Sequence, residues 1–365
     1  MAVGGLKCSL HTSRSAPRPT VEIGLLVPLH GSAGIFGPSC ESCARLAAEE
    51  INAAGGLLGR ELRLRVVDGS GPPERAAAMT ERLVHTGVVD AVVGWHISAV
   101  RRAVAPRIAS RVPYIYTALY AGGEHTPGVF LVGETPEAQL EPARRWLAQE
   151  RGARRWCIVG NDYVWPRTTA ALAQRYAQRI DGEVCEEMFV PLDTEHYAPV
   201  IGRVLASAAD AVLMLLVGQD AARFNRSFAD VGLDDQCLRL STLVDENTLL
   251  ASGSEGTRGL CSSAAYFETL ATPESLAFEA RYVARYGPAA PALNSPGESC
   301  YEGLLLLAAL AEAAGSLDVR ALSLAASKVE YSGPRGALHL RDRHLQQRVY
   351  LAEADGLEFD VLAQL

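Results

Sequence analysis

Short apolar runs alternate with helix-length segments along almost the whole chain. One series occupies the first part of the sequence, and a second series begins after Pro136. Because these runs are continuously apolar rather than alternating, they predict parallel strands that are buried on both faces. The chain is therefore expected to form two doubly wound α/β lobes. The predicted strands are residues 21–27, 62–68, 91–94, 114–116, 129–132, 156–159, 184–190, 211–217 and 238–243.

The segments between the predicted strands carry apolar stripes that suit helices covering a sheet. Between residues 40 and 51, apolar residues recur every three or four positions, and the stripe stops at Gly55-Gly56, a typical end signal for a helix. Two more helical segments, 275–286 and 298–314, follow the second series of strands, and a hairpin-like tail follows them. This remaining chain can complete either lobe, so more than one crossing between the lobes is open.

Charge and hydropathy exclude two classes of partner. The chain has 34 basic and 42 acidic residues and a net charge of -8, so direct binding of nucleic acid is not expected. The longest unbroken apolar stretch, residues 304–311, is far shorter than the roughly 20 residues that cross a bilayer. Residues 1–20 predict a flexible leader without the apolar region of a signal peptide. This favours a cytoplasmic protein, and the alternative is an exported protein whose leader is missing from this sequence.

Cysteine and histidine positions argue against a metal or cofactor site. Cys40 and Cys43 have no second pair at metal-binding spacing and lie on a helical stripe, so both are predicted to be core residues. The sequence contains no phosphate-binding loop, no G-x-S-x-G turn and no H-E-x-x-H pair. No metal, cofactor or catalytic residue is therefore expected. The enzymatic alternative is an amidase with Cys157 or Cys261 as its nucleophile.

Several blocks of the sequence resemble one protein family. Residues 21–31 and 47–60 are similar to the opening of the type I periplasmic binding proteins. The block Gly160-Asn-Asp-Tyr-Val-Trp-Pro-Arg167 is more specific, and it looks like the branch of this family that binds urea and short-chain amides. Residues 93–106 and 116–122 resemble the same branch.

The resemblance implies a hinged clamshell. Two α/β lobes, joined by three crossings of the chain, would hold a ligand in the cleft between them. The expected division assigns residues 21–136 and 262–332 to the N-terminal lobe and residues 137–261 and 333–365 to the C-terminal lobe.

Members of this branch act with different partners. The missing signal peptide favours a cytosolic sensor that closes on a small neutral amide or urea-like ligand and controls an RNA-binding antitermination regulator. The alternative is the substrate-binding component of an ABC importer for urea, amides or branched-chain amino acids, with a permease as its partner. Homo-oligomerisation stays open.

The first lobe supplies five candidate ligand contacts. Ser98 follows a predicted strand and begins a helix, so its hydroxyl and backbone N–H can meet a carbonyl oxygen or a carboxylate. A plain capping serine is the alternative. Tyr116, Ala118 and Tyr120 follow the next strand, where the resemblance implies backbone contacts and an aromatic wall. Ala118 and His96 stand where the amide sensor has a threonine and a tyrosine, and a structural role for His96 is equally open.

The second lobe supplies four more candidates. Tyr163 and Trp165 are two residues apart, and Pro166 disfavours helical backbone at Trp165, so both rings are expected on one side of an extended segment. Aromatic walls with one hydroxyl suit a small neutral amide, while core packing is the alternative for Trp165. Gly218 and Thr242 are candidates because each lies where a predicted strand ends.

Three acids in the same regions bear on the class of ligand. Asp162, Asp220 and Glu246 lie near the ends of predicted strands of the second lobe. An amino acid needs an acid to pair with its ammonium group, whereas urea or an amide needs none. Because an unpaired buried carboxylate is costly, a neutral ligand predicts that these acids are paired or solvated. The sequence leaves the choice open.

Overall fold

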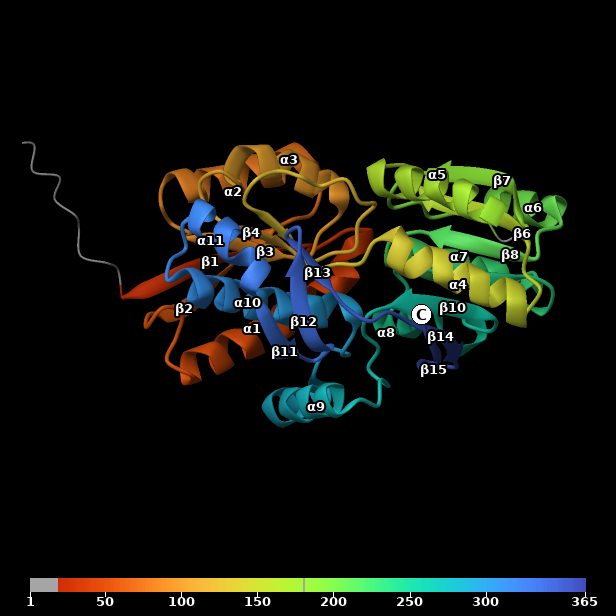
Figure 1. The fold of residues 1–365 in the computed structure, drawn as a ribbon. Coiled ribbons are helices and arrows are strands. Elements are labelled where there is room, and N and C mark those ends of the chain that lie inside the picture. The colour runs from red at the N-terminus through yellow and green to blue at the C-terminus, as the bar shows by residue number, and fades with distance from the viewer. Residues whose placement is uncertain (1–18, 180) are drawn as a thin grey trace, which may run out of the picture.

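Each lobe is built around one mixed β-sheet. The computed structural model describes residues 19–179 and 181–365, and the two lobes lie side by side (Figure 1). The first sheet has the strand order β11-β12-β13-β5-β4-β3-β1-β2, and the second has β15-β14-β10-β9-β8-β6-β7. The strands of the first sheet are β1 (Thr20–Val27), β2 (Glu61–Asp68), β3 (Ala91–Gly94), β4 (Tyr114–Tyr116), β5 (Val129–Leu131), β11 (Glu330–Gly333), β12 (Gly336–Arg341) and β13 (His344–Gln346). Those of the second are β6 (Arg155–Asn161), β7 (Glu183–Val190), β8 (Ala211–Leu215), β9 (Leu238–Ser241), β10 (Leu260–Ala264), β14 (Tyr350–Asp355) and β15 (Glu358–Gln364).

The centre of each sheet is parallel, as the apolar runs predict. Strands β3 and β8 are buried along their whole length, and they pair in parallel with their neighbours. The C-terminal strands add antiparallel edges, with β11 to β13 on the first sheet and β14 and β15 on the second. The predicted architecture of two α/β lobes is therefore confirmed, and the antiparallel edges make both sheets mixed.

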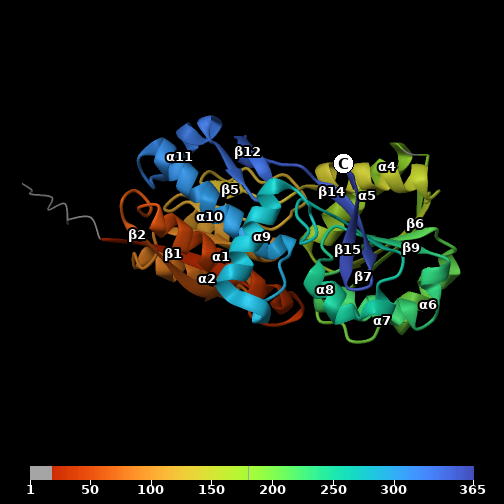
Figure 2. The ribbon, with the colours of Figure 1, turned by 90° about the horizontal axis from the view of Figure 1, so that it is seen from below.

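Helices cover both faces of each sheet. Figure 1 shows α2 and α3 on one side of the first sheet and α1 and α10 on the other. In Figure 2, α4 and α5 lie on one side of the second sheet and α6 and α7 on the other. The helices are α1 (Gly37–Ala53), α2 (Pro73–His85), α3 (Ser98–Ile108), α4 (Pro136–Glu150), α5 (Val164–Arg179), α6 (Ala198–Ser207), α7 (Gln219–Ala229), α8 (Glu246–Ser252), α9 (Pro273–Tyr286), α10 (Ser295–Ala314) and α11 (Val319–Ala325).

The chain passes between the lobes three times. The first crossing joins β5 to α4, the second follows β10, and the third joins β13 to β14. The expected boundary at residue 333 therefore differs from the sheet topology, because β12 and β13 still belong to the first sheet. A buried ion pair holds this hairpin there, since Arg335 Nε donates to Glu298 Oε2 of α10 at 2.5 Å. The sheets likewise place β10, which ends at Ala264, in the second lobe rather than ending that segment at residue 261.

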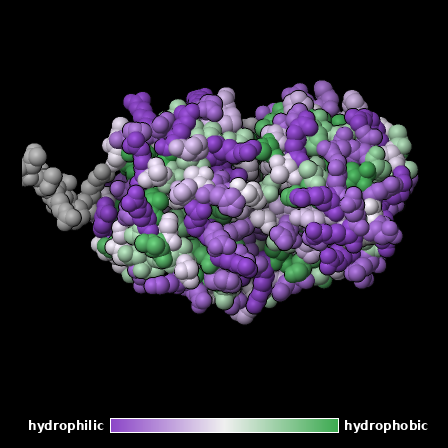
Figure 3. Space-filling view, turned by 45° about the horizontal axis from the view of Figure 1, so that its top comes forward, coloured by the Kyte–Doolittle hydropathy of each residue, from purple (hydrophilic) through white to green (hydrophobic). Residues whose placement is uncertain are grey.

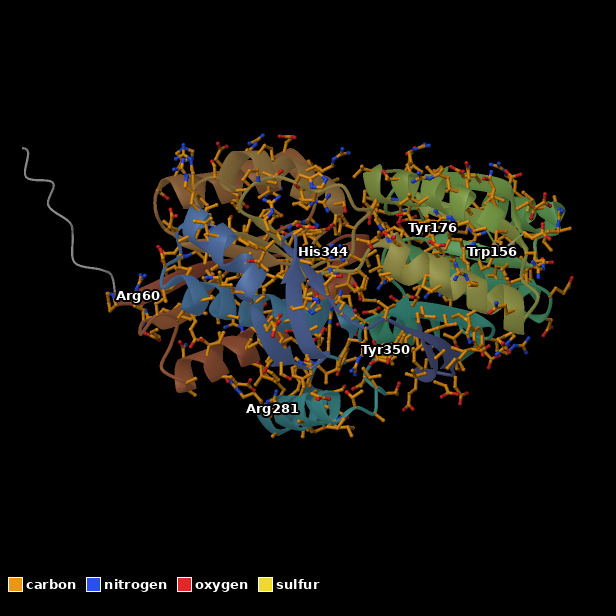
Figure 4. All side chains as sticks on the ribbon, viewed as in Figure 1. Arg60, Trp156, Tyr176, Arg281, His344 and Tyr350 are labelled. Atoms are coloured by element: carbon orange, nitrogen blue, oxygen red, sulfur yellow. The ribbon has the colours of Figure 1, made fainter. Side chains whose placement is uncertain are left out.

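The second sheet separates two apolar clusters. Alternate residues of a strand face opposite sides, so Trp156 and Ile158 of β6 join the cluster that continues into the first lobe. Cys157 and Val159 join a second cluster on the other face. Trp156 is fully buried within the second lobe (Figure 4), and the Arg144 guanidinium lies 4.7 Å from its ring centre. Hydrophilic side chains cover most of the outer face shown in Figure 3.

Three features of the described residues concern the cysteines, metal binding and membrane spans. Cys40 and Cys43 are buried in α1, and burial raises the pKa of both thiols well above the ordinary value. Within residues 19–179 and 181–365, no group of histidine, cysteine and acidic side chains is arranged to hold a metal ion. No helix of the same residues is both long and apolar enough to cross a membrane. The expected leader, residues 1–20, lies almost wholly outside the described part.

Candidate functional site

The lobes contact each other directly at one edge of the cleft. Ser32, which follows β1, donates its backbone N–H to Asp193 Oδ1 of the second lobe at 2.7 Å. Its hydroxyl oxygen lies 2.8 Å from the same oxygen and 2.7 Å from Asp220 Oδ1. Farther along the cleft, Asn247 of α8 donates to Ser39 Oγ of α1 at 3.0 Å. These contacts all join the two lobes, so the structure is a closed form.

A cavity lies between the lobes, and we call it the central cavity. Trp95 and Thr117 line it from the ends of β3 and β4, and Ser299 lines it from α10. Thr242 and Asp245 follow β9 and line it from the second lobe. Ligands of open α/β sheets bind beyond the carboxyl ends of strands, and both sheets meet the cavity at that edge.

Asp245 is a buried carboxylate with one free oxygen. Its Oδ1 caps α8 by accepting the backbone N–H of Thr248 at 3.0 Å and the Thr248 hydroxyl at 2.6 Å. Its Oδ2 has no hydrogen-bond partner among residues 19–179 and 181–365. Burial raises the pKa of Asp245 to about 6, although the bonds from Thr248 lower it in part. A cation at Oδ2 would therefore stabilise the ionised form.

The neighbouring Glu246 is also buried, but it serves a different contact. Its Oε1 accepts the backbone N–H of Glu268 at 2.8 Å, which ties α8 to the segment after β10. Burial, together with the nearby Asp245, raises the pKa of Glu246 well above its ordinary value. Glu246 does not line the central cavity, and the two acids that do are Asp245 and Glu134.

The crossings of the chain fix the wall of the central cavity. Gln139 Nε2 donates to the carbonyl of Ser263 at 2.7 Å and to that of Thr242 at 3.2 Å. Glu134 in the first crossing accepts the backbone N–H of Ala265 in the second crossing at 2.7 Å. Within the described chain, the Thr242 hydroxyl oxygen is buried without a partner. Thr242 Oγ1 and Asp245 Oδ2 are thus buried polar atoms at this cavity that a ligand can satisfy.

The predicted contacts His96, Ser98 and Tyr116 form a packed polar cluster in the first lobe. His96 Nε2 lies 2.8 Å from Tyr114 Oη, and the Tyr116 hydroxyl donates to the His96 carbonyl at 2.9 Å. Burial lowers the pKa of His96 to about 3, so the ring is neutral. Ser98 begins α3 without capping it, and its Oγ lies 3.4 Å from Tyr116 Oη. His96 is therefore buried, and its ring bonds within the first lobe.

Tyr120 and Ala118 lie against the crossings. Tyr120 Oη is 3.3 Å from His344 Nδ1, and His344 Nε2 is 2.9 Å from the carbonyl of Gly133. Figure 4 shows His344 near the middle of the molecule, beside β13. A Cβ added at Gly133 would lie 2.1 Å from the Ala118 carbonyl oxygen, so the backbones of these two residues touch. Both predicted residues therefore connect the end of β4 to the hinge.

Tyr163 and Trp165 differ from the prediction in their backbone. Helix α5 begins at Val164, so Trp165 is helical and the expected extended segment is wrong. The physical reason is that Pro166 lies in the first turn, where no N–H is needed for a helical hydrogen bond. The rings are still neighbours, with centres 6.2 Å apart. Burial and the nearby Tyr116 phenol raise the pKa of Tyr163.

Gly218 and Thr242 have different surroundings. Gly218 has a φ of +48°, and a Cβ there would lie 2.2 Å from the Ser32 carbonyl oxygen. It is therefore a point of close approach between the lobes. Thr242 lines the central cavity, as described above, whereas Ser98 and Trp165 line a separate cavity nearer the rim. Of the nine predicted residues, Thr242 thus lines one cavity, Ser98 and Trp165 line another, and Gly218 lies at a closure contact.

The sequence analysis did not select Trp95, Thr117 or Asp245. Trp95 and Thr117 are the immediate neighbours of the predicted His96 and Tyr116, and they have the opposite parity at the ends of β3 and β4. Alternate residues of a strand face opposite sides. A prediction that is wrong by one residue therefore selects a side chain in the packed interior instead of one in the cavity wall. For Asp245, a usable signal was present, since aspartate is a preferred residue at the N-cap of a helix.

Comparisons with known proteins agree with this architecture. The model of the family described as "Periplasmic binding protein" matches residues 20–358. A Leu/Ile/Val-binding protein homolog 6 from Brucella melitensis is 27% identical and aligns over 91% of this chain and 87% of its own. A substrate-binding protein of an ABC transporter from Sphaerobacter thermophilus has 25% identity and a TM-score of 0.81, covering 95% of this chain and 98% of its own. A solute-binding protein from Rhodopseudomonas palustris, solved with p-hydroxybenzoic acid, has 23% identity and a TM-score of 0.85, covering 95% and 96%.

The two lobes and their three crossings have the fold of the type I periplasmic binding proteins. The match over residues 20–358 makes the assignment specific. The chain belongs to the periplasmic binding protein family.

Proposed function

We propose that this protein is the substrate-binding component of an ABC importer and that it closes over a small amino acid. The observation that carries the proposal is Asp245, whose buried Oδ2 lacks a partner at the central cavity. An ammonium group placed there would donate to this oxygen and compensate its charge. The name of the Brucella relative, a Leu/Ile/Val-binding protein homolog, supports the same class of ligand.

The other walls suit the remainder of an amino acid. Trp95 offers an apolar surface, and the hydroxyls of Thr117 and Thr242 come from opposite lobes. A ligand that contacts both lobes binds the closed form better than the open one, so it shifts the population toward closure. Recognition of the closed form by a permease would complete the import step. This role goes with the exported alternative rather than with the cytoplasmic location that the sequence favoured.

The amide-sensor interpretation has less support. Ala118 lacks the hydroxyl of the amide sensor, and Tyr116 and His96 satisfy each other within the first lobe. A neutral amide also leaves the charge of Asp245 unpaired. The amino-acid ligand therefore replaces the amide or urea ligand as the leading proposal.

The protonation state of the two candidate thiols argues against the amidase alternative. Burial raises the pKa of Cys157 and Cys261 to about 12. A thiol with such a pKa is almost entirely protonated at neutral pH, and the thiolate is the nucleophile. Neither cysteine is therefore suited to attack an amide.

A ligand screen followed by calorimetry tests the proposal. L-leucine, L-valine, acetamide and urea are added separately, and the thermal midpoint and the Kd are measured. We expect leucine or valine to raise the midpoint, because a ligand that binds only the folded protein stabilises it. The Asp245→Asn variant should bind that amino acid more weakly by about 2 kcal/mol or more, since it removes the charge that faces the ammonium.

The matched control is Asp162→Asn, which removes an acid that pairs with Arg167 at the surface of the second lobe. Its affinity should equal that of the unmodified protein. Tight binding of acetamide or urea that survives Asp245→Asn, with no response to either amino acid, would contradict the proposed ligand class.

A further inference from the structure

Three buried cysteines meet where α1 packs against α10. Figures 1 and 2 show these two helices side by side on one face of the first sheet. Cys40 and Cys43 lie on α1, Cys300 lies on α10, and all three side chains are fully buried. The described part of the chain holds seven cysteines, all of them free thiols. A buried thiol normally acts as a small core residue, so any further role for this group has to follow from its geometry.

The backbones of the two helices touch beside these cysteines. A Cβ added at Gly297 of α10 would lie 3.0 Å from both the carbonyl carbon and the Cβ of Ser39 in α1. Cys40 follows Ser39 directly, and Cys300 lies three residues after Gly297, on the same side of α10. A disulfide needs Cα atoms that are only about 4.4–6.8 Å apart. The close contact at Gly297 therefore favours a bond between α1 and α10 at this level.

The side chain of Cys40 is directed at the turn of α10 that carries Cys300. Its Sγ donates to the carbonyl oxygen of Pro296 at 3.4 Å. In an α-helix, that carbonyl also accepts the backbone N–H four residues later, which here belongs to Cys300. The Cys40 sulfur and the Cys300 backbone thus meet at the same oxygen atom.

The thiols of Cys40 and Cys300 affect each other's protons. Burial raises the pKa of Cys40, and the hydrogen bond with the Cys300 thiol raises it further. Burial alone would raise the pKa of Cys300 as well, but its bonds with Cys40 and Thr117 lower it overall. Cys43 is influenced by Cys300 through charge alone. Cys40 is therefore the better-placed partner for Cys300, and Cys43 is the competing partner.

We propose that Cys40 and Cys300 form a disulfide when the protein folds under oxidising conditions, and that this bond ties α1 to α10 in the first lobe. The reaction is a thiol–disulfide exchange whose oxidant is itself a disulfide. The Cys300 thiolate attacks one sulfur of the oxidant, which forms a mixed disulfide and releases the first oxidant thiol. The Cys40 thiolate then attacks the Cys300 sulfur and releases the second. The two cysteines lose two protons and two electrons, and the two released thiols carry them.

The bond lies directly behind the wall of the central cavity. Thr117 Oγ1 is 3.6 Å from Cys300 Sγ and 3.2 Å from Ser299 Oγ, and both Thr117 and Ser299 line that cavity. The disulfide would therefore fix the turn of α10 that supplies part of this wall. Exported proteins meet disulfide oxidants, so the bond suits the proposed role in import. The inference does not depend on the class of ligand, and its test involves no ligand.

Refolding of the reduced full chain with oxidised glutathione tests the proposal. Free thiols are blocked with N-ethylmaleimide, and the protein is digested with trypsin and with a protease that cleaves after glutamate. Cleavage after Glu41 separates Cys40 from Cys43, so mass spectrometry identifies each linked pair. We expect a linked pair of peptides that contain Cys40 and Cys300. The oxidised chain should have a thermal midpoint about 5 °C or more above that of the reduced chain, because a bond across a long loop restricts the unfolded state.

Cys43→Ser is the matched control, because Cys43 is buried in the same helix. This variant should keep both the linked pair and the rise in midpoint, whereas Cys40→Ser and Cys300→Ser should each abolish both. If Cys300→Ser does not fold, Cys40→Ala gives the same comparison, since alanine suits a buried helical position. A bond between Cys43 and Cys300, complete blocking of all eight cysteines after refolding, or a midpoint no higher than that of the reduced chain would overturn the proposal.

Discussion

Removing the Asp193 carboxylate should weaken closure without harming the fold. Asp193 Oδ1 accepts the backbone N–H of Ser32 at 2.7 Å, and within the described residues it is the only acceptor for that N–H. The Ser32 hydroxyl keeps a second acceptor, Asp220 Oδ1 at 2.7 Å. The variant therefore loses one charge-assisted bond between the lobes, and its hydroxyl bond can be replaced. Asp193 has a φ of +63°, so Asp193→Gly removes the carboxylate and suits the backbone.

A bond of this kind to a charged group contributes about 1.5–3 kcal/mol, and the exposed position of Asp193 argues for the lower end. About 1.5 kcal/mol corresponds to roughly a tenfold fall in the ratio of closed to open protein. The ligand-free variant should therefore have a larger radius of gyration in small-angle X-ray scattering. Its Kd for L-leucine should rise by up to about tenfold, because binding draws on the closed population.

The companion variant Asp193→Asn keeps an acceptor oxygen and tolerates the left-handed backbone, so it should lose less affinity than Asp193→Gly. The thermal midpoints of both ligand-free variants should stay close to that of the unmodified protein. An unchanged radius of gyration together with an unchanged Kd in Asp193→Gly would refute the argument that this contact stabilises closure.

Three further perturbations test other parts of the argument. The pKa of Asp245 is about 6, and only its ionised form pairs with an ammonium. Calorimetry should therefore show that the affinity for leucine falls about tenfold per pH unit below pH 6 and levels off above pH 7. The affinity of Asp245→Asn should not change with pH over this range. The same raised pKa means that the ligand-free protein loses stability as the pH rises from about 4 to about 6, by up to about 3 kcal/mol from this group, and denaturant unfolding of Asp245→Asn should lack that loss. Gly218→Ala places a Cβ against the Ser32 carbonyl, so scattering should show an opened molecule, and a closed one would contradict the close approach. Arg335→Met leaves the buried Glu298 without its partner and should cost about 3–5 kcal/mol of unfolding free energy, while a loss below about 1 kcal/mol would show that the pair is dispensable.

Much of the fold follows from local sequence pattern. The apolar runs at β3 and β8 are strands buried on both faces, and the stripe that ends near Gly55 is helix α1. Such patterns are local, because a strand or helix must bury its apolar face wherever it packs. The lobe boundary near residue 333 was harder to predict, since no sequence pattern in the turn-rich hairpin there indicates which of the two sheets it joins. The ion pair between Arg335 and Glu298 decides it.

The candidate site depends on tertiary structure more strongly than the fold does. The sequence predicts ligand contacts where strands end, and among the predicted residues Thr242 lines the central cavity. It could not decide between neighbours such as His96 and Trp95, because side chains one residue apart point to opposite sides, one toward the cavity and one toward the protein interior.

The sequence by itself determined two α/β lobes, their family and the segments at the cleft, because these depend on residue type and spacing along the chain. Only the tertiary structure decided that one oxygen of Asp245 lacks a partner and that Cys40 lies beside Cys300. Whether a polar atom is satisfied depends on every group around it, and those groups come from segments far apart in the sequence. The chemistry of the ligand can therefore be inferred only from the folded structure.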